Sequence, residues 1–281
     1  PAVEGVTADK AKGGGVPGKA GTWRPLALGE FILGHEDEAS RDDPARALPH
    51  APDDPIGRNG TYMVWRKLEQ DVALFRRTLR DAAALYQGGD EEKLAAKVVG
   101  RWRNGTPLVL SPDTAMPNFD STAPGANDFR YTEQDSDGHC CPLGAHIRRS
   151  NPRDALGFDG EGTLTFRHRM IRRGMPYGPM LPPGITEPDG QERGLVFVCF
   201  VASISRQFEG VQVQWLEDGN IFHLGHDKDF LLRAGTTGTP KMTVQGEPPF
   251  FLSPQPSFVT LRGGEYLFVP GITALGILAA P

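Results

Sequence analysis

Near the middle of the chain, a histidine stands among residue types that could do chemistry. The stretch CCPLGAHIRRSNPRDA, residues 140–155, places His146 after two adjacent cysteines and before arginines at two, three and seven positions downstream. An imidazole can coordinate zinc, act as a catalytic base, ligate the iron of a cofactor, or simply pack inside the protein. The local sequence leaves all four roles open.

A zinc site or a reactive thiol at this stretch finds little support in the spacing. Zinc would use His139, Cys140, Cys141 and His146, but adjacent cysteines suit a tetrahedral site poorly and no second Cys or His pair completes the set. A catalytic thiol would need a base beside it, and only the adjacency of His139 and Cys140 offers one. Three cysteines, two of them adjacent, cannot form an ordinary disulfide framework, which favours a reducing, cytoplasmic compartment.

Two charged stretches elsewhere could contribute to a site. GHEDE, residues 34–38, presents Glu36, Asp37 and Glu38 after an apolar segment, where they could reach a cleft or form a solvated acidic loop. RHRMIRRGMPYGP, residues 167–179, carries two adjacent arginines before a turn. These arginines could equally lie on the surface of an edge strand.

Composition narrows the classes of function. With 281 residues the chain can form one large or two modest domains, and 35 glycines with 25 prolines indicate many turns. The net charge of -5, with dispersed basic residues, argues against nucleic acid as a partner. The longest apolar run, which starts at Gly194, is shorter than the roughly 20 residues that span a membrane. The Asn-Gly-Thr sequences at Asn59 and Asn104 match glycosylation acceptors, but we interpret them as tight turns.

The elements that must position these residues follow from the spacing of apolar side chains. Residues 61–68, TYMVWRKL, predict a strand that runs into an amphipathic helix beginning near Glu69, and residues 91–102 predict a second helix. Residues 194–200, GLVFVCF, are apolar on both faces and predict a buried strand. A helix packed against that strand is indicated by one apolar stripe, formed by Ile204, Phe208, Val211 and Trp215.

The two ends of the chain differ in character. Residues 257–278, SFVTLRGGEYLFVPGITALGIL, predict a strand, a Gly-Gly turn, a second strand and a short closing helix. Residues 1–22 are rich in Gly, Lys and Ala without periodicity, so we expect an exposed arm, and the missing initiator methionine leads us to expect a processed chain. Together the elements predict an α+β fold in which helices cover antiparallel sheets.

Three segments together resemble the dye-decolourising peroxidases. GHEDE fits the G-x-x-D motif of that family, AHIRRSNPR resembles the segment that carries its haem-ligating histidine, and RMIRRGMPYG is similar to its distal-arginine segment. Further matches are GLVFVCF followed by SISRQFEGVQVQWL, and FVTLRGGEYLFVPGI. All five follow the family's order, so the resemblance extends from about Trp23 to Ala279.

This resemblance implies a ferredoxin-like α+β fold of the dimeric α/β-barrel type that binds haem b. It also implies that hydrogen peroxide is reduced while dyes, phenols or other organic reductants lose single electrons. His146 would be the proximal iron ligand, Asp37 the distal acid and base, and Arg172 the distal cation. Such a trio is chemically coherent, because imidazole ligates the iron, a carboxylate moves protons and an arginine stays charged.

Further residues take roles by the same resemblance. Leu195 and Phe197, on one face of a strand, would form the wall of the distal pocket. Arg148 and Arg153 would pair with the haem propionates. Tyr177, beyond a Gly-x-Pro turn that should carry the chain away from the haem, is a candidate for passing electrons to bulky reductants.

Two positions depart from many members of that family. Glu38 stands where many relatives have a glycine after the distal aspartate. Ser203 stands in the segment aligned with an aspartate that hydrogen-bonds the proximal histidine in many relatives. We therefore expect a neutral partner for the histidine and a higher reduction potential of the iron.

The resemblance also implies how the chain is divided. Residues 1–22 would be the arm, residues 23–120 a distal-side segment that completes a first ferredoxin-like half, and residues 121–281 the C-terminal, haem-binding half. Relatives have a fuller first half, so we expect a second polypeptide, cleaved or separate, to supply the rest in a heteromer. The competing hypothesis is a haem-binding or haem-handling protein without peroxidase turnover, which would not need Asp37 or Arg172.

Overall fold

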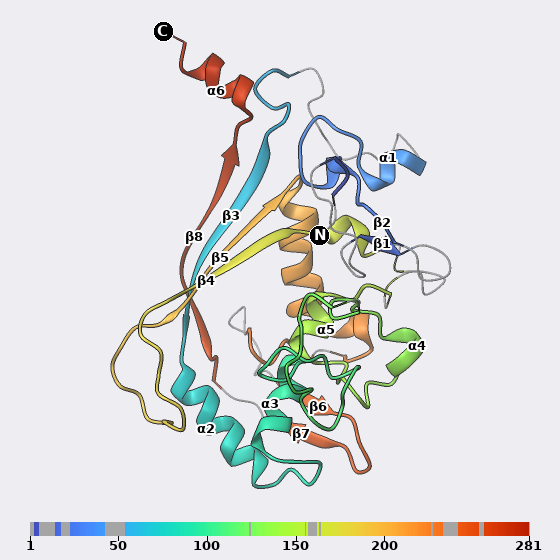
Figure 1. Cartoon of the computed structure of the whole chain (residues 1–281). Helices are drawn as coiled ribbons and strands as arrows, with labels where there is room; N and C mark the ends of the chain where they lie inside the picture. The colour runs from blue at the N-terminus through green and yellow to red at the C-terminus, as the bar shows by residue number, and fades with distance from the viewer. Residues whose placement is uncertain are drawn as a thin grey trace.

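One antiparallel sheet of four strands, in the order β4-β5-β3-β8, organises the chain (Figure 1). The computed structural model describes residues 3–5, 15–17, 23–42, 54–123, 125–154, 156, 162, 164–225, 227–232, 241–252 and 256–280. The strands of the sheet are β3 (Thr61–Gln70), β4 (Ile171–Tyr177), β5 (Gly194–Val201) and β8 (Val259–Val269).

The connections of this sheet are those of a ferredoxin-like unit. Helix α2 (Val72–Ala83) follows β3, and two consecutive helical segments, η5 (Ile204–Glu209) and η6 (Val211–Leu216), follow β5. The order is therefore strand, helix, strand, strand, helix, strand, with every neighbouring pair antiparallel. This confirms the expected α+β class. Because strands of one sheet come from both sides of residue 120, the expected boundary there does not separate two sheets.

Helices α2 and α3 (Glu91–Val99) begin where the sequence supplies N-caps. The Asp71 carboxylate accepts a hydrogen bond of 2.8 Å from the Leu74 amide, and Asp90 caps α3 in the same way. We expected α2 to begin near Glu69, but Glu69 and Gln70 stay paired with β8, so the helix starts at Val72. The sheet ladder outweighs the helical periodicity at these two residues.

The expected Gly-Gly turn near the C-terminus is wrong. Gly263 and Gly264 lie inside the continuous strand β8, where the register with β3 shifts. A Cβ atom on Gly264 would lie 2.9 Å from the Trp65 carbonyl oxygen, so a glycine allows the strands to approach at this irregularity. The closing helix is present as expected, as α6 (Ile272–Leu278).

The remaining elements are short. They are β1 (Val16–Pro17), β2 (Trp23–Arg24), η2 (Leu28–Glu30), α1 (Glu38–Asp42), α4 (Thr132–Asp135), α5 (His146–Ser150), η4 (Phe166–His168), η7 (Asn220–Phe222), β6 (Met242–Val244) and β7 (Phe250–Leu252). None of the helices in the described part of the chain is long and apolar enough to cross a membrane.

We expected an exposed N-terminal arm, but two of its described valines are buried. Val3 and Val16 are buried at 1% and 4% exposure, in a cluster with Leu26 and Phe31. Strand β1 also pairs with β2. Residues 1–2, 6–14 and 18–22 of the expected arm lie outside the described residues.

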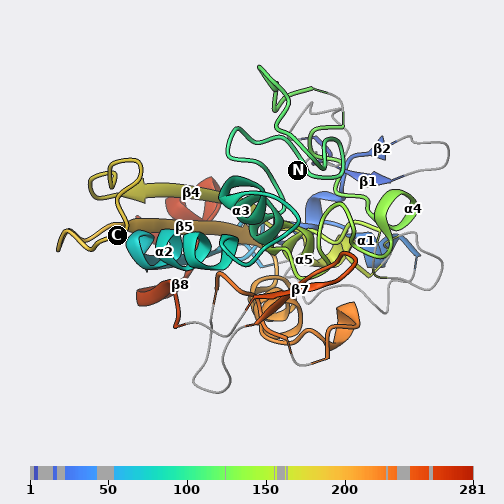
Figure 2. The ribbon, with the colours of Figure 1, turned by 90° about the horizontal axis from the view of Figure 1, so that it is seen from below.

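The two faces of the sheet differ in what covers them. Helices α3 and α5 lie on one side of it (Figures 1 and 2), and on that side Val64, Cys199 and Val201 are fully buried with Phe208 from η5. On the opposite face, Met63 of β3 stands in register with Phe200 and Leu267, and these side chains are only partly buried. We call this opposite side, with Trp65 and Val198, the outer face of the sheet.

Candidate functional site

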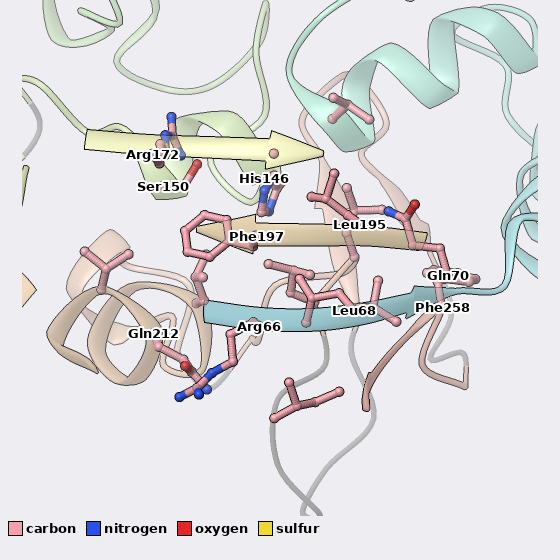
Figure 3. Close-up of a pocket in the computed structure, with 18 of the residues that line it drawn as sticks. Arg66, Leu68, Gln70, His146, Ser150, Arg172, Leu195, Phe197, Gln212 and Phe258 are labelled. Atoms are coloured by element: carbon pink, nitrogen blue, oxygen red, sulfur yellow. The ribbon is translucent and has the colours of Figure 1, made fainter. Parts of the chain in front are cut away.

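A cavity of about 860 Å³ lies between the covered face of the sheet and the helical layer. Its size falls in the range of small-molecule and cofactor sites, roughly 300 to 1,000 Å³. Figure 3 shows Leu68, Leu195 and Phe197 projecting toward it from β3 and β5. The wall is mostly apolar, with a few polar groups that include His146 and Arg172.

His146 is the first residue of α5 and reaches this cavity with one ring edge. Its Nδ1 atom lies 3.0 Å from the Asp229 Oδ2 atom, and the Asp229 side chain is fully buried. The other Asp229 oxygen accepts hydrogen bonds from the amides of Leu231 and Leu232 at 3.0 and 2.7 Å. Because Asp229 fixes Nδ1 as the donor, Nε2 carries the lone pair, which is the usual arrangement of a metal-ligating histidine.

The partner of His146 corrects an expectation from the sequence. Burial by itself raises the pKa of the Asp229 carboxyl, but the interaction with His146, the charge of Arg149 and the donated hydrogen bonds outweigh it, so the net pKa lies below the usual range. The imidazole therefore has an ionised partner and not the neutral Ser203. Ser203 precedes η5, and its hydroxyl accepts a hydrogen bond from the Arg206 amide.

Asp229 is the site residue that sequence reasoning missed. It lies 83 residues after His146, in a stretch, GHDKDFLLR, that no motif singled out. The available signal was an aspartate directly before the apolar run Phe230–Leu232, since a carboxylate buried in such a run needs a hydrogen-bonding partner.

Arg172 enters the cavity from β4. Its Nη2 atom donates a hydrogen bond of 2.8 Å to the Asn151 side-chain oxygen, and Asn151 is buried just after α5. Surrounding protein atoms lower the pKa of the Arg172 guanidinium from its ordinary value, because the charged form loses hydration. An arginine remains a cation even so. The structure thus brings His146, Arg172, Leu195 and Phe197 to one cavity.

Asp37 does not line the cavity. Its side chain is buried at 2% exposure and its Oδ1 atom accepts a hydrogen bond of 2.7 Å from the Ser40 amide. Its Oδ2 atom lies 3.7 Å from Nη2 of Arg206, in η5. Two residues further along η5, Phe208 lines the cavity. Asp37 therefore lies behind the cavity wall, connected to it through η5.

The two arginines expected to pair with propionates have different surroundings. Arg148 is buried in an ion pair with Asp135 at 3.0 Å and also donates to backbone carbonyls, so its guanidinium is held away from the cavity. Arg153 has a buried Nε atom without a hydrogen-bond partner among the described residues. Burial, together with the charges of Arg169 and Arg172, lowers the pKa of Arg153 well below its usual value. A cluster of buried cations of this kind favours an anion.

Tyr177 and the thiols lie outside the cavity. Tyr177 is on the outer face of the sheet, with its ring 4.9 Å from the Lys67 ammonium and its hydroxyl 3.4 Å from Glu192. Cys141 is fully buried, which raises the pKa of its thiol to about 12. A thiol that stays protonated at neutral pH is a poor nucleophile.

Comparisons with known proteins find relatives within one family. The family described as "Dyp-type peroxidase, C-terminal" matches residues 27–224. The multifunctional dye peroxidase DyP2 of Amycolatopsis is 35% identical over 285 residues, which cover 91% of this chain and 58% of that protein. The chain thus spans little more than half the length of this relative.

Two further matches bear on fold and on function. The crystal structure of a fungal DyP-type peroxidase from Auricularia auricula-judae superposes with a TM-score of 0.77 at 26% identity, covering 98% of this chain and 60% of that one. A shorter match, 29% identical over 155 residues, covers 54% of this chain and 27% of a deferrochelatase of Yersinia pestis.

Proposed function

The chain belongs to the Dyp-type peroxidase family, and on that premise we propose that it binds haem b in the cavity and works as a peroxidase. In this proposal it reduces hydrogen peroxide and takes single electrons from dyes, phenols or other organic reductants. The observation that carries the proposal is the hydrogen bond between His146 and the buried Asp229 at the cavity wall.

The residues present fit a haem group. The cavity, at about 860 Å³, is large enough and mainly apolar. His146 would bind the haem iron through Nε2, and Asp229 would increase the electron density on the ring. Arg153, a buried cation beside Arg169 and Arg172, would pair with a propionate. We do not assign Arg148 to a propionate, because Asp135 already holds it.

When bound, haem supplies the iron that receives peroxide and stores its oxidising equivalents. The protein contributes proton transfer and charge. Asp37 takes a proton from the inner oxygen of hydrogen peroxide and returns it to the departing oxygen, working first as base and then as acid. Since Asp37 lies behind the wall, the proton travels through a bridging water or after rotation of the side chain. Arg172 stabilises the negative charge that develops as the oxygen–oxygen bond breaks.

Tyr177 is proposed to pass electrons from bulky reductants. An apolar cavity admits peroxide but not a large dye, and Tyr177 lies on the outer face beside Lys67 and Glu192. Tyr177→Phe keeps the ring and removes the phenol, so it is expected to lower turnover of large dyes more than that of small phenols. Steady-state rates with one dye and one phenol measure this, and undiminished dye turnover would remove Tyr177 from the path.

A second polypeptide, cleaved or separate, is proposed to cover the outer face of the sheet. Met175 and Leu267 on this face are 46% and 41% exposed, and Met63, Trp65 and Phe200 are only partly buried. An apolar sheet face of this kind is usually covered by protein. Mass measurement of the native assembly tests this proposal, and a monomer of this chain alone with full haem and activity contradicts it.

The peroxidase proposal is tested with the haem-loaded 281-residue chain. We expect an absorption spectrum with a Soret band and oxidation of a dye that depends on added hydrogen peroxide. The second candidate is a haem-handling protein without turnover, favoured by the match to a deferrochelatase. That candidate predicts a Soret band without peroxide-dependent dye oxidation, whereas the peroxidase predicts both. Arg172 at the cavity favours the peroxidase.

A further inference from the structure

A buried network of charges surrounds the carboxylate of Asp37. Glu30, the last residue of η2, is fully buried, and its Oε2 atom lies 3.1 Å from Nη2 of Arg206. The same nitrogen lies 3.7 Å from Oδ2 of Asp37. One guanidinium group therefore faces two carboxylates inside the protein.

The backbone fixes this network on both sides. The Glu30 Oε1 atom accepts a hydrogen bond of 3.1 Å from the Glu38 amide, one residue beyond Asp37. The Glu30 carbonyl accepts a hydrogen bond of 2.8 Å from the Gln207 side chain, next to Arg206. Glu30 thus joins the segment that carries Asp37 to the helical segment η5. Its side chain is the link between the motif at residues 34–38 and the cavity wall.

Other charged groups around the network have their own partners or are farther away. Glu38 forms an ion pair of 2.5 Å with Arg24 and accepts from the Ala27 amide. Arg167 and His168 of η4 face Arg206, and the pKa of His168 is lowered by burial, so its ring is neutral at neutral pH. The Nε and Nη1 atoms of Arg206 are buried without hydrogen-bond partners in the described part of the chain. The Arg206 charge is therefore shared between Glu30 and Asp37.

We propose that Arg206, anchored by Glu30, is a positioning residue that holds the Asp37 carboxylate ionised and correctly oriented for proton transfer. This inference rests on the proposed peroxidase function. Arg206 supplies the opposite charge that a carboxylate needs at a buried position. The ionisation state of Glu30 sets how strongly Arg206 attracts Asp37.

The consequence is a dependence on pH near neutrality. Burial raises the pKa of Glu30 to about 7, although Arg206 opposes the shift. Below that pH Glu30 is neutral, so within this network the Arg206 guanidinium faces only one negative charge, that of Asp37. Above it, ionised Glu30 competes for Arg206 and adds a second negative charge beside Asp37. The reaction with peroxide is therefore fastest in mildly acidic solution.

The test compares rates of reaction with hydrogen peroxide, from about pH 4 to about pH 9, in the haem-loaded chain and its variants. In the unmodified protein the rate falls above neutral pH, and Glu30→Gln removes this fall. Glu36→Gln is the matched control, because Glu36 is an exposed neighbour outside the network. This control leaves the profile unchanged.

Variants of Arg206 test the other half of the network. Arg206→Met moves the acidic limb of the profile to higher pH by about one unit or more, as expected when a carboxylate loses a cation within roughly 4 to 6 Å. Arg206→Lys, which keeps the charge, leaves the acidic limb close to its position in the unmodified protein. A merely structural role of Arg206 would lower the rate equally at every pH.

A second readout is independent of turnover. In the haem-free chain, infrared difference spectra are expected to show a carboxylic acid band that disappears near pH 7 in the unmodified protein, where the pKa of Glu30 is raised to about 7, and that is absent in Glu30→Gln. A profile of Glu30→Gln that falls above neutral pH like that of the unmodified protein overturns the inference, and so does an unmoved acidic limb in Arg206→Met. No reaction with peroxide at any pH, with the infrared titration intact, instead refutes the peroxidase function on which the inference depends.

Discussion

At the scale of single residues, the site depends on one buried hydrogen bond. Asp229 lies at 0% exposure 3.0 Å from His146, and it accepts two further backbone hydrogen bonds. A buried carboxylate with that many donors stays ionised and keeps the imidazole in one tautomer and one orientation. The protein alone therefore holds the imidazole of His146 in place, as its proposed role as iron ligand requires.

His146→Ala is expected to abolish stable haem binding, because no other histidine enters the cavity among its lining residues in the described part of the chain. The absorbance of the Soret band per mole of protein measures haem loading. His139→Ala is the matched control, since this exposed histidine lies outside the cavity. Full haem loading with an unchanged spectrum in His146→Ala would refute the ligand assignment.

Arg172→Leu is expected to slow the reaction with hydrogen peroxide by about 100-fold, while haem binding changes much less. The reason is that the charge of Arg172 acts on the breaking oxygen–oxygen bond and not on the bound ground state. Stopped-flow spectra after peroxide addition measure the rate. Equal rates in the variant and the unmodified protein would exclude this role.

At the scale of elements, strand β8 shows how pairing with a neighbouring strand overrides a turn signal in the sequence. Two adjacent glycines predict a turn from the sequence, yet β8 pairs with β3 on both sides of a register shift that lies next to them. The pairing partner decides, because each strand residue gains ladder hydrogen bonds that an isolated turn would lose. This strand supplies Val259 and Leu261 to the cavity.

Gly264→Ala is expected to destabilise the protein by about 1 to 3 kcal/mol, since the added methyl group meets backbone at this close approach. The new Cβ atom would lie 2.9 Å from the Trp65 carbonyl oxygen. Urea unfolding measures the free energy of unfolding. Gly276→Ala in α6, where nothing lies within 4 Å of the new Cβ atom, serves as control and should keep or slightly raise stability. Equal stabilities of the two variants would contradict the steric explanation.

At the scale of the whole molecule, a ferredoxin-like unit holds the cavity between its sheet and its helices. Strand β3 comes early in the chain and β8 late, yet they are neighbours in the sheet. Residues from β4, β5 and α5 therefore meet although they are far apart in sequence. The outer face of the same sheet remains partly exposed, which is why a covering polypeptide forms part of the proposal.

The stability of the whole chain is expected to fall as pH rises through about 7. The pKa of Glu30 is raised from 4.5 to about 7 in the folded protein, so its contribution to stability is complete below about pH 4.5 and is lost above pH 7. At most about 3 to 4 kcal/mol is involved, at about 1.4 kcal/mol for each pKa unit. Denaturant unfolding at several pH values measures this change. Glu30→Gln should flatten the dependence in that range, and an unchanged slope would contradict the assignment to Glu30.

The sequence by itself determined the fold class and the residues of the principal motifs. Periodicity predicted β3, α2, α3, β5 and α6 because apolar spacing and capping residues act within a few residues of one another. The resemblance to the family singled out His146, Arg172, Leu195 and Phe197, and the structure brings them to one cavity. Caps and strand pairing then corrected only the boundaries of these elements.

Only the tertiary structure decided which charged groups face one another. Asp229 meets His146 across 83 residues, and Arg206 meets Glu30 across 176. Neither pair leaves a local pattern, because a buried ion pair depends on which chain segments the sheet brings together and not on spacing along the chain. For the same reason the family resemblance implied that Arg148 pairs with a haem propionate, whereas its buried ion pair with Asp135 holds it away from the cavity. Desolvation, which raises the pKa of Glu30, likewise acts only once the chain is folded.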